Sequence, residues 1–187
     1  IMKGKNGDCP YCREKFIKEE LEVVKPNKEI IDQHNNINKW GTKVSYLINY
    51  LKNLIENDND NRIILFSQWD SMLKLIGKVL NEFEIKHLFL NGSLHVVNSR
   101  IRKFKLDKSY RVVLISSDKA SSGLNLQEAN NIILLDTVNN EKKTSKLIEE
   151  QAIGRAVRIG QKKQVEVIRL IMEDTIEYDY YTDNLVK

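Results

Sequence analysis

The sequence has little cysteine and no long hydrophobic run. Two cysteines in 187 residues cannot form the disulfide framework of a small secreted protein. No apolar stretch approaches the roughly 18 to 20 residues that a membrane-spanning helix needs, so no membrane partner is expected. No basic segment followed by an apolar one opens the chain, as it would in a signal peptide. We therefore expect an intracellular protein.

Two motifs of nucleotide hydrolysis are also missing. The sequence contains no G-x-x-x-x-G-K-[S/T] phosphate loop, and the dipeptide Asp-Glu, with which a D-E-x-H-like acidic motif begins, does not occur. Such motifs supply a lysine and backbone amides for the phosphates, and an acidic group for Mg²⁺ and the attacking water. Hydrolysis of ATP by this chain alone is therefore excluded, and any nucleotide site that it contributes to is half of an active site.

The composition is that of a soluble globular protein, with 41% hydrophobic and 30% charged residues. The length suits one main domain with an appendage. Thirty basic and 26 acidic side chains give a net charge of +4, which permits a polyanionic partner such as DNA without requiring one. Because the sequence starts at Ile1, in the middle of apparent sequence, we expect a piece of a larger protein.

The hydrophobic pattern from residue 42 onward alternates between helices and strands. A helix is expected from Thr42, as its N-cap, until the N-D-N-D-N stretch. Continuous apolar runs at 62–67 and 85–90 enclose a helical pattern at 69–83 and predict a strand–helix–strand unit with strands buried on both faces. Further strands are expected at 111–116, 131–136 and 165–171. These elements predict an α/β fold over about residues 42–187, a doubly wound parallel sheet with helices on both faces.

Small polar residues follow the predicted strands. In such sheets ligands bind beyond the carboxyl ends of the strands, and hydroxyl, amide and backbone N–H groups there can hold phosphate or sugar. Each residue alone could instead be a helix N-cap, but the groups recur at one edge of the sheet. The candidate ligands for the backbone of a nucleic acid such as DNA are Ser67, Gln68, Asn91, Gly92, Ser93, Ser116 and Ser117, and Asp136 follows the fourth strand.

The first 17 residues contain C-P-Y-C at Cys9 to Cys12. This spacing can supply half of a tetrahedral zinc or redox site, and the alternative is two ordinary thiols. No second cysteine pair occurs, so a zinc ion would need further ligands upstream. Residues 18–41 are polar and rich in Asn, which is typical of a linker.

The stretch Gln151 to Gln161 reads Q-A-I-G-R-A-V-R-I-G-Q. If it is helical, Gln151, Arg155 and Arg158 line one stripe at i, i+4 and i+7. Two planar, permanently charged guanidiniums on one stripe suit the binding of phosphate oxygens. The alternative is a solvated helix face.

Four motifs in order resemble those of a known family: I-L-F-S-Q-W, N-G-S, S-x6-G-L-N-L and the 151–161 stretch. Over about residues 42–180 they are similar to the second, C-terminal RecA-like lobe of Swi/Snf-family superfamily-two ATPases, which translocate on double-stranded DNA. The resemblance implies that Arg155 and Arg158 act as arginine fingers on ATP and Mg²⁺ held by an N-terminal lobe, with Gln151 orienting them. It also implies that Gly123 and Asn125 lie near the nucleotide and that Ser116 or Ser117 touches the tracking strand.

The sequence departs from the family at two places. Ala120 and Ser121 stand where paired small glycines are usual, and 136–151 lacks the Trp-Trp-Asn-Pro run. Divergent members, including those of large DNA viruses, are similar, so a nucleus or a viral replication compartment is expected. The C-P-x-C-R segment resembles the last ligand pair of a RING finger, found in one branch of the family. That resemblance leaves open an alternative, a non-catalytic interaction module that recruits a ubiquitin-conjugating enzyme.

A basic cluster lies between the second and third predicted strands. It is expected to be either a solvated helix face or a surface that binds the DNA backbone through phosphates without reading base sequence, and in the second case affinity falls with salt. Arg100 and Lys103 are the candidate DNA ligands. A nucleotide-independent DNA-binding domain is the third reading. The cluster consists of Arg100, Arg102, Lys103, Lys105 and Lys108.

Overall fold

The structure is a computed structural model that describes residues 7–8, 15–16, 40–120, 123–137, 142–157, 161 and 163–182. Cys9, Cys12 and residues 18–39 of the linker expected at 18–41 lie outside the described residues. So does Arg158, one of the two predicted arginine fingers. None of the described helices is both long and apolar enough to cross a membrane.

Five parallel strands form the central sheet, in the order β4-β5-β3-β6-β7. Ile63 lies opposite Val112 on one side and opposite Asn131 on the other, which fixes the register of the three central strands. The doubly wound parallel sheet that the sequence predicts is therefore confirmed. The strands are β3 (Ile63–Ser67), β4 (His87–Phe89), β5 (Val112–Ser116), β6 (Asn131–Leu134) and β7 (Glu166–Arg169).

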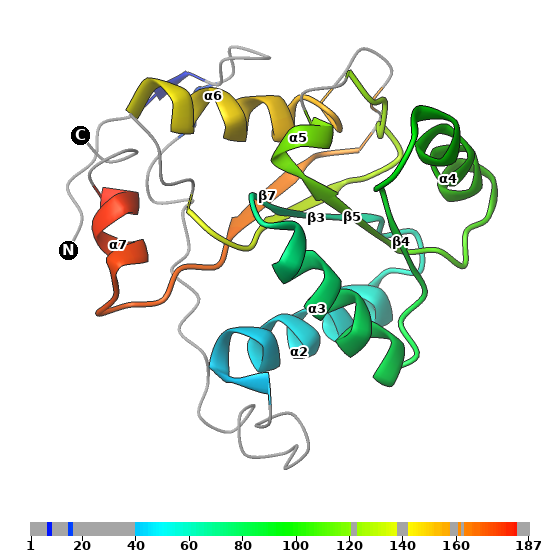
Figure 1. Cartoon of the computed structure of the whole chain (residues 1–187), viewed down its shortest axis with the longest axis horizontal. Helices are drawn as coiled ribbons and strands as arrows, with labels where there is room; N and C mark the ends of the chain where they lie inside the picture. The colour runs from blue at the N-terminus through cyan, green and yellow to red at the C-terminus, as the bar shows by residue number, and fades with distance from the viewer. Residues whose placement is uncertain are drawn as a thin grey trace.

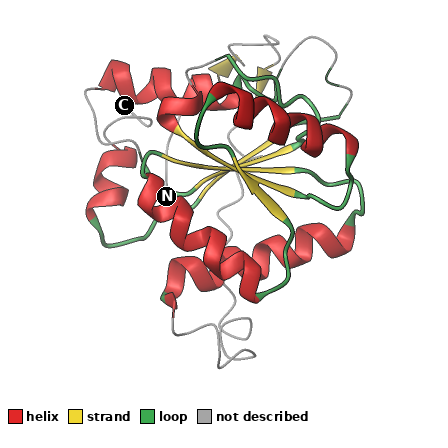
Figure 2. Cartoon of the chain, turned by 45° about the vertical axis from the view of Figure 1, so that its right-hand side comes forward, coloured by secondary structure: helices red, strands yellow, loops and turns green. Residues whose placement is uncertain are grey.

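Helices cover both faces of the sheet, which Figure 2 shows between two helical layers. On one face lie α2 (Thr42–Asn57) and α3 (Asp70–Glu82), and on the other lie α4 (Leu94–Leu106), α5 (Ser117–Ala120) and α6 (Lys142–Ile153). Figure 1 shows α6 beside the short α5, which follows β5 directly. The last helix, α7 (Ile176–Tyr181), buries none of its residues fully.

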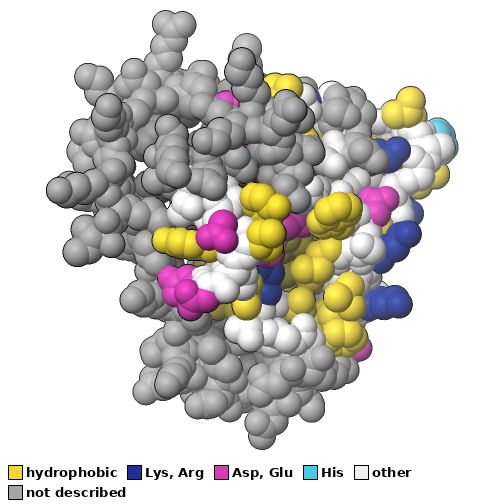
Figure 3. Space-filling view, turned by 60° about the vertical axis from the view of Figure 1, so that its left-hand side comes forward, with side chains coloured by type: hydrophobic (Ala, Val, Ile, Leu, Met, Phe, Trp, Pro, Cys, Tyr) yellow, Lys and Arg dark blue, Asp and Glu magenta, His cyan; other side chains and the backbone are white. Residues whose placement is uncertain are grey.

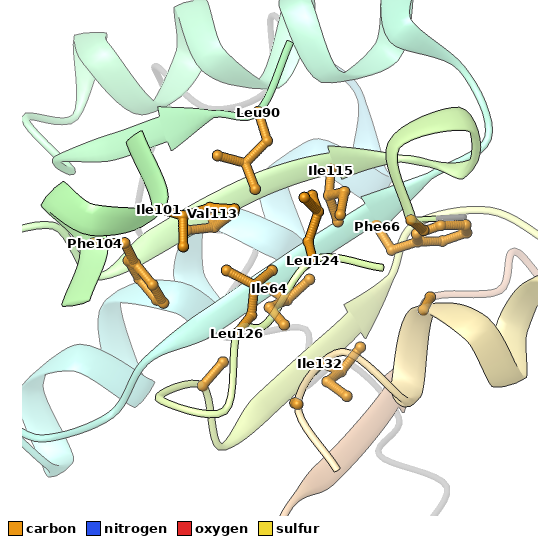
Figure 4. Packing of buried hydrophobic residues seen from close by; sticks show 14 of the residues in the cluster. Ile64, Phe66, Leu90, Ile101, Phe104, Val113, Ile115, Leu124, Leu126 and Ile132 are labelled. Atoms are coloured by element: carbon orange, nitrogen blue, oxygen red, sulfur yellow. The ribbon is translucent and has the colours of Figure 1, made fainter. Parts of the chain in front are cut away.

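The core has two halves, because successive side chains of a strand point to opposite faces of the sheet. Ile64 and Phe66 of β3 pack toward α4 and α6, while Ile63 and Leu65 pack toward α2 and α3. Figure 4 shows the first half, in which Phe104 of α4 approaches the sheet. All five side chains of β3, and all five of β5, are buried. The strands therefore read as continuous apolar runs.

The start of α2 differs from the prediction. Thr42 is the first helical residue, and Gly41 occupies the N-cap position with φ +82° and without a side-chain cap. This left-handed conformation favours glycine. The first turn is closed instead by Ser45, whose hydroxyl donates to the Gly41 carbonyl at 2.8 Å.

Before the main domain, two short strands pair with each other. β1 (Gly7–Asp8) and β2 (Lys15–Phe16) are antiparallel, with Gly7 opposite Phe16. The C-P-Y-C stretch lies between them in the sequence.

Candidate nucleotide and nucleic-acid site

At the carboxyl edge of the sheet, Asp136 joins the ends of β3 and β6. Its carboxylate accepts hydrogen bonds from the Ser67 hydroxyl and, at 3.0 Å, from the backbone N–H of Gln68. The Gln68 side chain donates to the Thr137 carbonyl at 3.0 Å. Burial raises the pKa of Asp136 above its ordinary value, and the hydrogen bonds from Ser67 and Gln68 offset part of that rise.

These hydrogen bonds to Asp136 change how Ser67 and Gln68 are interpreted. Ser67 is completely buried, and its hydroxyl and the Gln68 amide both bind groups of the protein. Both residues were predicted to contact DNA, and that contact stays a prediction. In this structure they fix the loop that follows β3. The sequence spacing did not indicate the hydrogen bond between Ser67 and Asp136, because Asp136 lies 69 residues after Ser67.

The loop after β4 is held by two basic side chains. Arg100 donates through Nη1 to the carbonyls of Phe89 at 2.5 Å and Asn91 at 3.0 Å, and also to the Asn91 side chain. Lys119 of α5 donates to the Gly92 carbonyl at 3.1 Å. Gly92 has φ +90°, which suits glycine. Arg100, predicted as a DNA ligand, thus binds the loop itself, while Gly92 and Ser93 at its tip are exposed.

Three lysines of the predicted basic cluster also have partners within the chain. The Lys103 ammonium lies 4.4 Å from the centre of the Tyr110 ring, and Lys105 pairs with Glu128 at 3.3 Å. Lys108, beyond the end of α4, pairs with Asp60 at 3.1 Å. Arg102 and Lys103 remain exposed on the helix. Of the five cations, Lys105 and Lys108 are therefore paired with carboxylates.

The segment after β5 contains the other predicted site residues. Ser116 is buried and Ser117 begins α5. Gly123 has φ +76° and is exposed. Asn125 accepts a hydrogen bond from the backbone N–H of Gln127 at 3.2 Å, which closes the turn toward β6. The segment leaves the carboxyl end of β5, buries Leu124 and Leu126 in the core, and reaches the amino end of the sheet at Asn130, whose backbone N–H donates to the Arg62 carbonyl at 3.0 Å.

The stretch that begins at Gln151 is α-helical as far as Ile153 and continues as a turn through Arg155. α6 ends at Ile153, and Arg155 and Ala156 donate to carbonyls three residues earlier, at 3.2 and 3.1 Å. Helix propensity explains the change, since Gly154 costs about 1 kcal/mol in a helix relative to alanine. Arg155 therefore lies in a hydrogen-bonded turn that continues from α6, in which Gly154 and Val157 donate to carbonyls four residues earlier, at 2.8 and 3.1 Å. The side chains of Gln151 and Arg155 are half-buried.

The turn is attached to the segment after β5. The backbone N–H of Leu126 donates to the Arg155 carbonyl at 3.0 Å. The neighbouring side chains Ala152 and Ala156 are fully buried beside Leu126 in one half of the core. The structure thus brings together two predicted site segments, the one with Gly123 and Asn125 and the one with Arg155.

A shallow pocket lies between α3 and α7. Figure 3, turned so that the left-hand side of Figure 1 comes forward, shows hydrophobic and acidic side chains together on this face. The carboxylates of the pocket have partners in the protein: Asp136 binds Ser67 and Gln68, and Glu177 binds Lys43. Among the described residues, no group of three or more His, Cys, Asp or Glu side chains could hold a metal ion. The pocket is lined by Trp69, Ser71, Met72, Leu75, Leu135, Asp136 and Glu177.

Comparison with known proteins decides the family, because the profile of the "Helicase conserved C-terminal domain" matches residues 42–160. The chain belongs to this helicase family. The helicase-family chain is 38% identical over 138 residues to an uncharacterized ATP-dependent helicase of Schizosaccharomyces pombe, covering 73% of this chain and 13% of that protein. It is 32% identical over 175 residues to DNA repair protein RAD5B of Arabidopsis thaliana, covering 91% of this chain and 13% of that protein.

A solved structure supports the same assignment. The C-terminal part of the Fun30 ATPase domain superposes with a TM-score of 0.72 at 29% identity, over 82% of this chain and 48% of that one. The predicted RecA-like fold and the resemblance to the second lobe of Swi/Snf-type ATPases are confirmed. The chain spans only 13% of the length of each of these two relatives.

Proposed function

We propose that this helicase C-terminal domain is the second motor lobe of an ATP-dependent DNA translocase. The observation that carries the proposal is the family match, together with the attachment of the Arg155 turn to the segment that contains Gly123 and Asn125. In this proposal ATP is bound mainly by an N-terminal RecA-like lobe of the same protein. Arg155 and Arg158 reach it across the cleft between the lobes.

The chemistry of the proposed fingers is electrostatic. Negative charge develops on the γ-phosphate oxygens during phosphoryl transfer, and a guanidinium placed against it accelerates the reaction by about 10³ to 10⁵. Arg155 carries this charge at every physiological pH. Gln151 would orient the cluster, and Gly123 and Asn125 would line the cleft.

We expect Mg²⁺ to bind to the N-terminal lobe and not to this chain. The described residues hold no cluster of three His, Cys, Asp or Glu side chains, and the carboxylate of Asp136 already accepts two hydrogen bonds from the protein. We therefore assign Mg²⁺ to acidic residues of the N-terminal lobe. When bound, it neutralises charge on the phosphates.

The proposed DNA grip is on the phosphate backbone. Gly92, Ser93 and Lys103 are exposed, and Ser117 is half-buried at the start of α5. Backbone N–H, hydroxyl and ammonium groups of this kind bind phosphates without reading base sequence. The affinity for duplex DNA should then fall as salt rises. Closing the two lobes on ATP and opening them after hydrolysis would move the protein along the duplex.

The test is the DNA-stimulated ATPase activity of the intact protein. Arg155→Ala and Arg158→Ala are each expected to lower kcat by about 10³ or more, with the melting temperature nearly unchanged. Lys78→Ala, on the exposed side of α3, is the control and should retain full turnover. Wild-type kcat in either arginine variant rejects the finger assignment. The 187-residue chain alone is expected to release no phosphate from ATP, with or without DNA.

The relatives give this proposal its setting. One is named a DNA repair protein, of Arabidopsis thaliana, and another transcription termination factor 2, of Drosophila melanogaster. We accordingly propose that the intact protein acts on DNA in the nucleus.

A second candidate function concerns the amino-terminal residues. β1 and β2 pair with each other, and the C-x-x-C spacing of the sequence between them is half of a tetrahedral zinc site. A RING of this kind, completed by ligands upstream, would recruit a ubiquitin-conjugating enzyme. Zinc analysis of the intact protein together with a ubiquitin-transfer assay tests this role independently of ATP hydrolysis.

A further inference from the structure

We infer that Gln161 is a positioning residue for Arg155, an inference that rests on the proposed function. The Gln161 side chain donates through Nε2 to the carbonyls of Gln127 at 2.8 Å, Ala129 at 2.9 Å and Ala156 at 3.3 Å. Two of these carbonyls belong to the segment that leads into β6. The third belongs to the residue immediately after Arg155. One carboxamide therefore joins the Arg155 turn to the segment beyond Gly123 and Asn125.

Both the nitrogen and the oxygen of the Gln161 carboxamide form hydrogen bonds. Its Oε1 accepts a hydrogen bond from the backbone N–H of Lys163 at 3.0 Å, and its two N–H groups serve three carbonyls. The side chain is half-buried, so its loss leaves backbone carbonyls without their donor in a partly dry environment, where unmet polar groups are costly. A side chain with four hydrogen-bond partners fixes the relative position of the two segments it joins.

The Arg155 turn is attached to the rest of the domain at three places. α6 has ended at Ile153, and backbone hydrogen bonds continue through the turn as far as Val157, which donates to the Ile153 carbonyl at 3.1 Å. Contacts with the rest of the domain add to these local bonds. The Arg155 carbonyl accepts from Leu126 at 3.0 Å, and the buried Ala156 holds the turn against the core. Gln161 adds the third attachment, through the Ala156 carbonyl.

The bridge demands a glutamine. A leucine of similar size has no donor, and a glutamate would place carboxylate oxygens against the carbonyl oxygens of Gln127, Ala129 and Ala156. An asparagine is one methylene shorter. The residues after Gln161 have an anchor of their own, because the Lys163 ammonium donates to the Asp60 carbonyl at 3.0 Å. Substitution at Gln161 should therefore loosen the Arg155 turn without releasing β7.

The experiment measures DNA-stimulated ATP hydrolysis by the intact protein. A displacement of about 1 Å at a catalytic group can cost roughly 10²-fold in rate, so Gln161→Leu is expected to lower kcat by about 10- to 100-fold. The KM for ATP should change little, since the N-terminal lobe holds the nucleotide. Gln164→Leu is the matched control, because Gln164 is an exposed glutamine three residues later. It should retain the wild-type kcat.

Two further arms separate positioning from a general loss of structure. Gln161→Glu keeps the shape of the side chain and carries the test should Gln161→Leu fail to fold. The facing carbonyls disfavour the charged carboxylate, and only a protonated glutamic acid can donate to a carbonyl, so its kcat relative to wild type should recover in part as the pH falls. In the double variant Arg155→Ala/Gln161→Leu, kcat should be no lower than in Arg155→Ala alone, because Gln161 acts through Arg155.

The outcomes distinguish this inference from the proposed function. Wild-type turnover in Arg155→Ala overturns the finger assignment, whatever the Gln161 variants do. A slow Arg155→Ala with a wild-type kcat in Gln161→Leu overturns the positioning role alone. Independent, multiplying losses in the double variant also overturn it, as does a rise in KM for ATP that accounts for the whole defect.

Discussion

Lys43, in the first turn of α2, attaches that helix to the end of the domain, and replacing it with methionine should loosen α7. The Lys43 ammonium donates to Glu177 at 2.6 Å and to the Leu135 carbonyl at 2.7 Å. Glu177 also accepts from the backbone N–H of Met172 at 3.1 Å. This one ion pair therefore connects α2, the end of β6 and α7. Methionine keeps the apolar stem of the side chain and removes only its charge and donors.

The magnitude follows from the burial of the pair. The Lys43 and Glu177 side chains are 14% and 28% exposed, which lies between the exposed pairs, worth about 0.2 to 1 kcal/mol, and fully buried pairs, whose disruption costs about 3 to 5 kcal/mol. We expect Lys43→Met to lower the free energy of unfolding by about 2 kcal/mol, a value typical of a hydrogen bond to a charged group. For a domain of this size that corresponds to a fall in Tm of about 4 to 8 °C.

Thermal and urea unfolding of the 187-residue chain, followed by circular dichroism, measure this loss. Lys78→Met, at an exposed position of α3, is the control and should change stability by less than about 0.5 kcal/mol. A double-mutant cycle with Glu177→Gln should give a coupling energy of about 1 to 2 kcal/mol. A coupling near zero, or equal effects of Lys43→Met and Lys78→Met, would refute the reasoning.

Two other predictions concern the carboxyl edge of the sheet. Burial raises the folded-state pKa of Asp136 above its ordinary value of 3.8, so the folded state binds a proton more readily than the unfolded state. The stability that this proton contributes is lost as pH rises through the folded-state pKa. Wild type should accordingly gain stability relative to Asp136→Asn as pH falls toward 3.8, and the opposite trend in urea unfolding would contradict this. Gly123→Ala should destabilise the chain by about 1 to 2 kcal/mol, because φ is +76° there; Gly123→Asn should cost less, and equal losses in the two variants would argue against backbone strain.

The strands were predictable because both faces of the sheet are covered. β3 and β5 bury every side chain, so each appears in the sequence as a continuous apolar run bounded by polar residues. The predicted bounds extend past the observed ones where burial continues beyond the ladder. Arg62 is an example: it is buried at the amino end of β3, with its guanidinium donating to the Phe104 carbonyl.

Site geometry was predictable only where it follows from chain order. The strand-end loops meet at one edge, as parallel topology requires, but their side chains pair with residues far away in the sequence. Ser67 binds Asp136 across 69 positions, and in the same way Lys105 of α4 binds Glu128. Such pairs leave no local pattern, so side chains that read as free DNA ligands have partners within the protein.

The stretch from Gln151 to Gln161 was predictable in its residues but not in its backbone path. The spacing of Gln151 and Arg155 predicts a shared stripe only if the helix continues, and it ends at Ile153. Gly154 is unfavourable inside a helix. Gln161 binds both the Arg155 turn, through the Ala156 carbonyl, and the segment before β6, through the Ala129 carbonyl. Sequence identified the residues of the stretch, whereas its backbone path depends on contacts made by Gln161, to which the motif spacing assigns no role.

The claim that a guanidinium of this chain completes the ATP site is tested most directly by chemical rescue. The rate of a single turnover of ATP is measured on the intact, DNA-bound Arg155→Ala protein, with guanidinium chloride added at low concentration or with sodium chloride at the same ionic strength. The account predicts a rate about 10³-fold or more below wild type, unchanged ATP affinity, and partial recovery with guanidinium alone. A wild-type rate in the unsupplemented variant would contradict it.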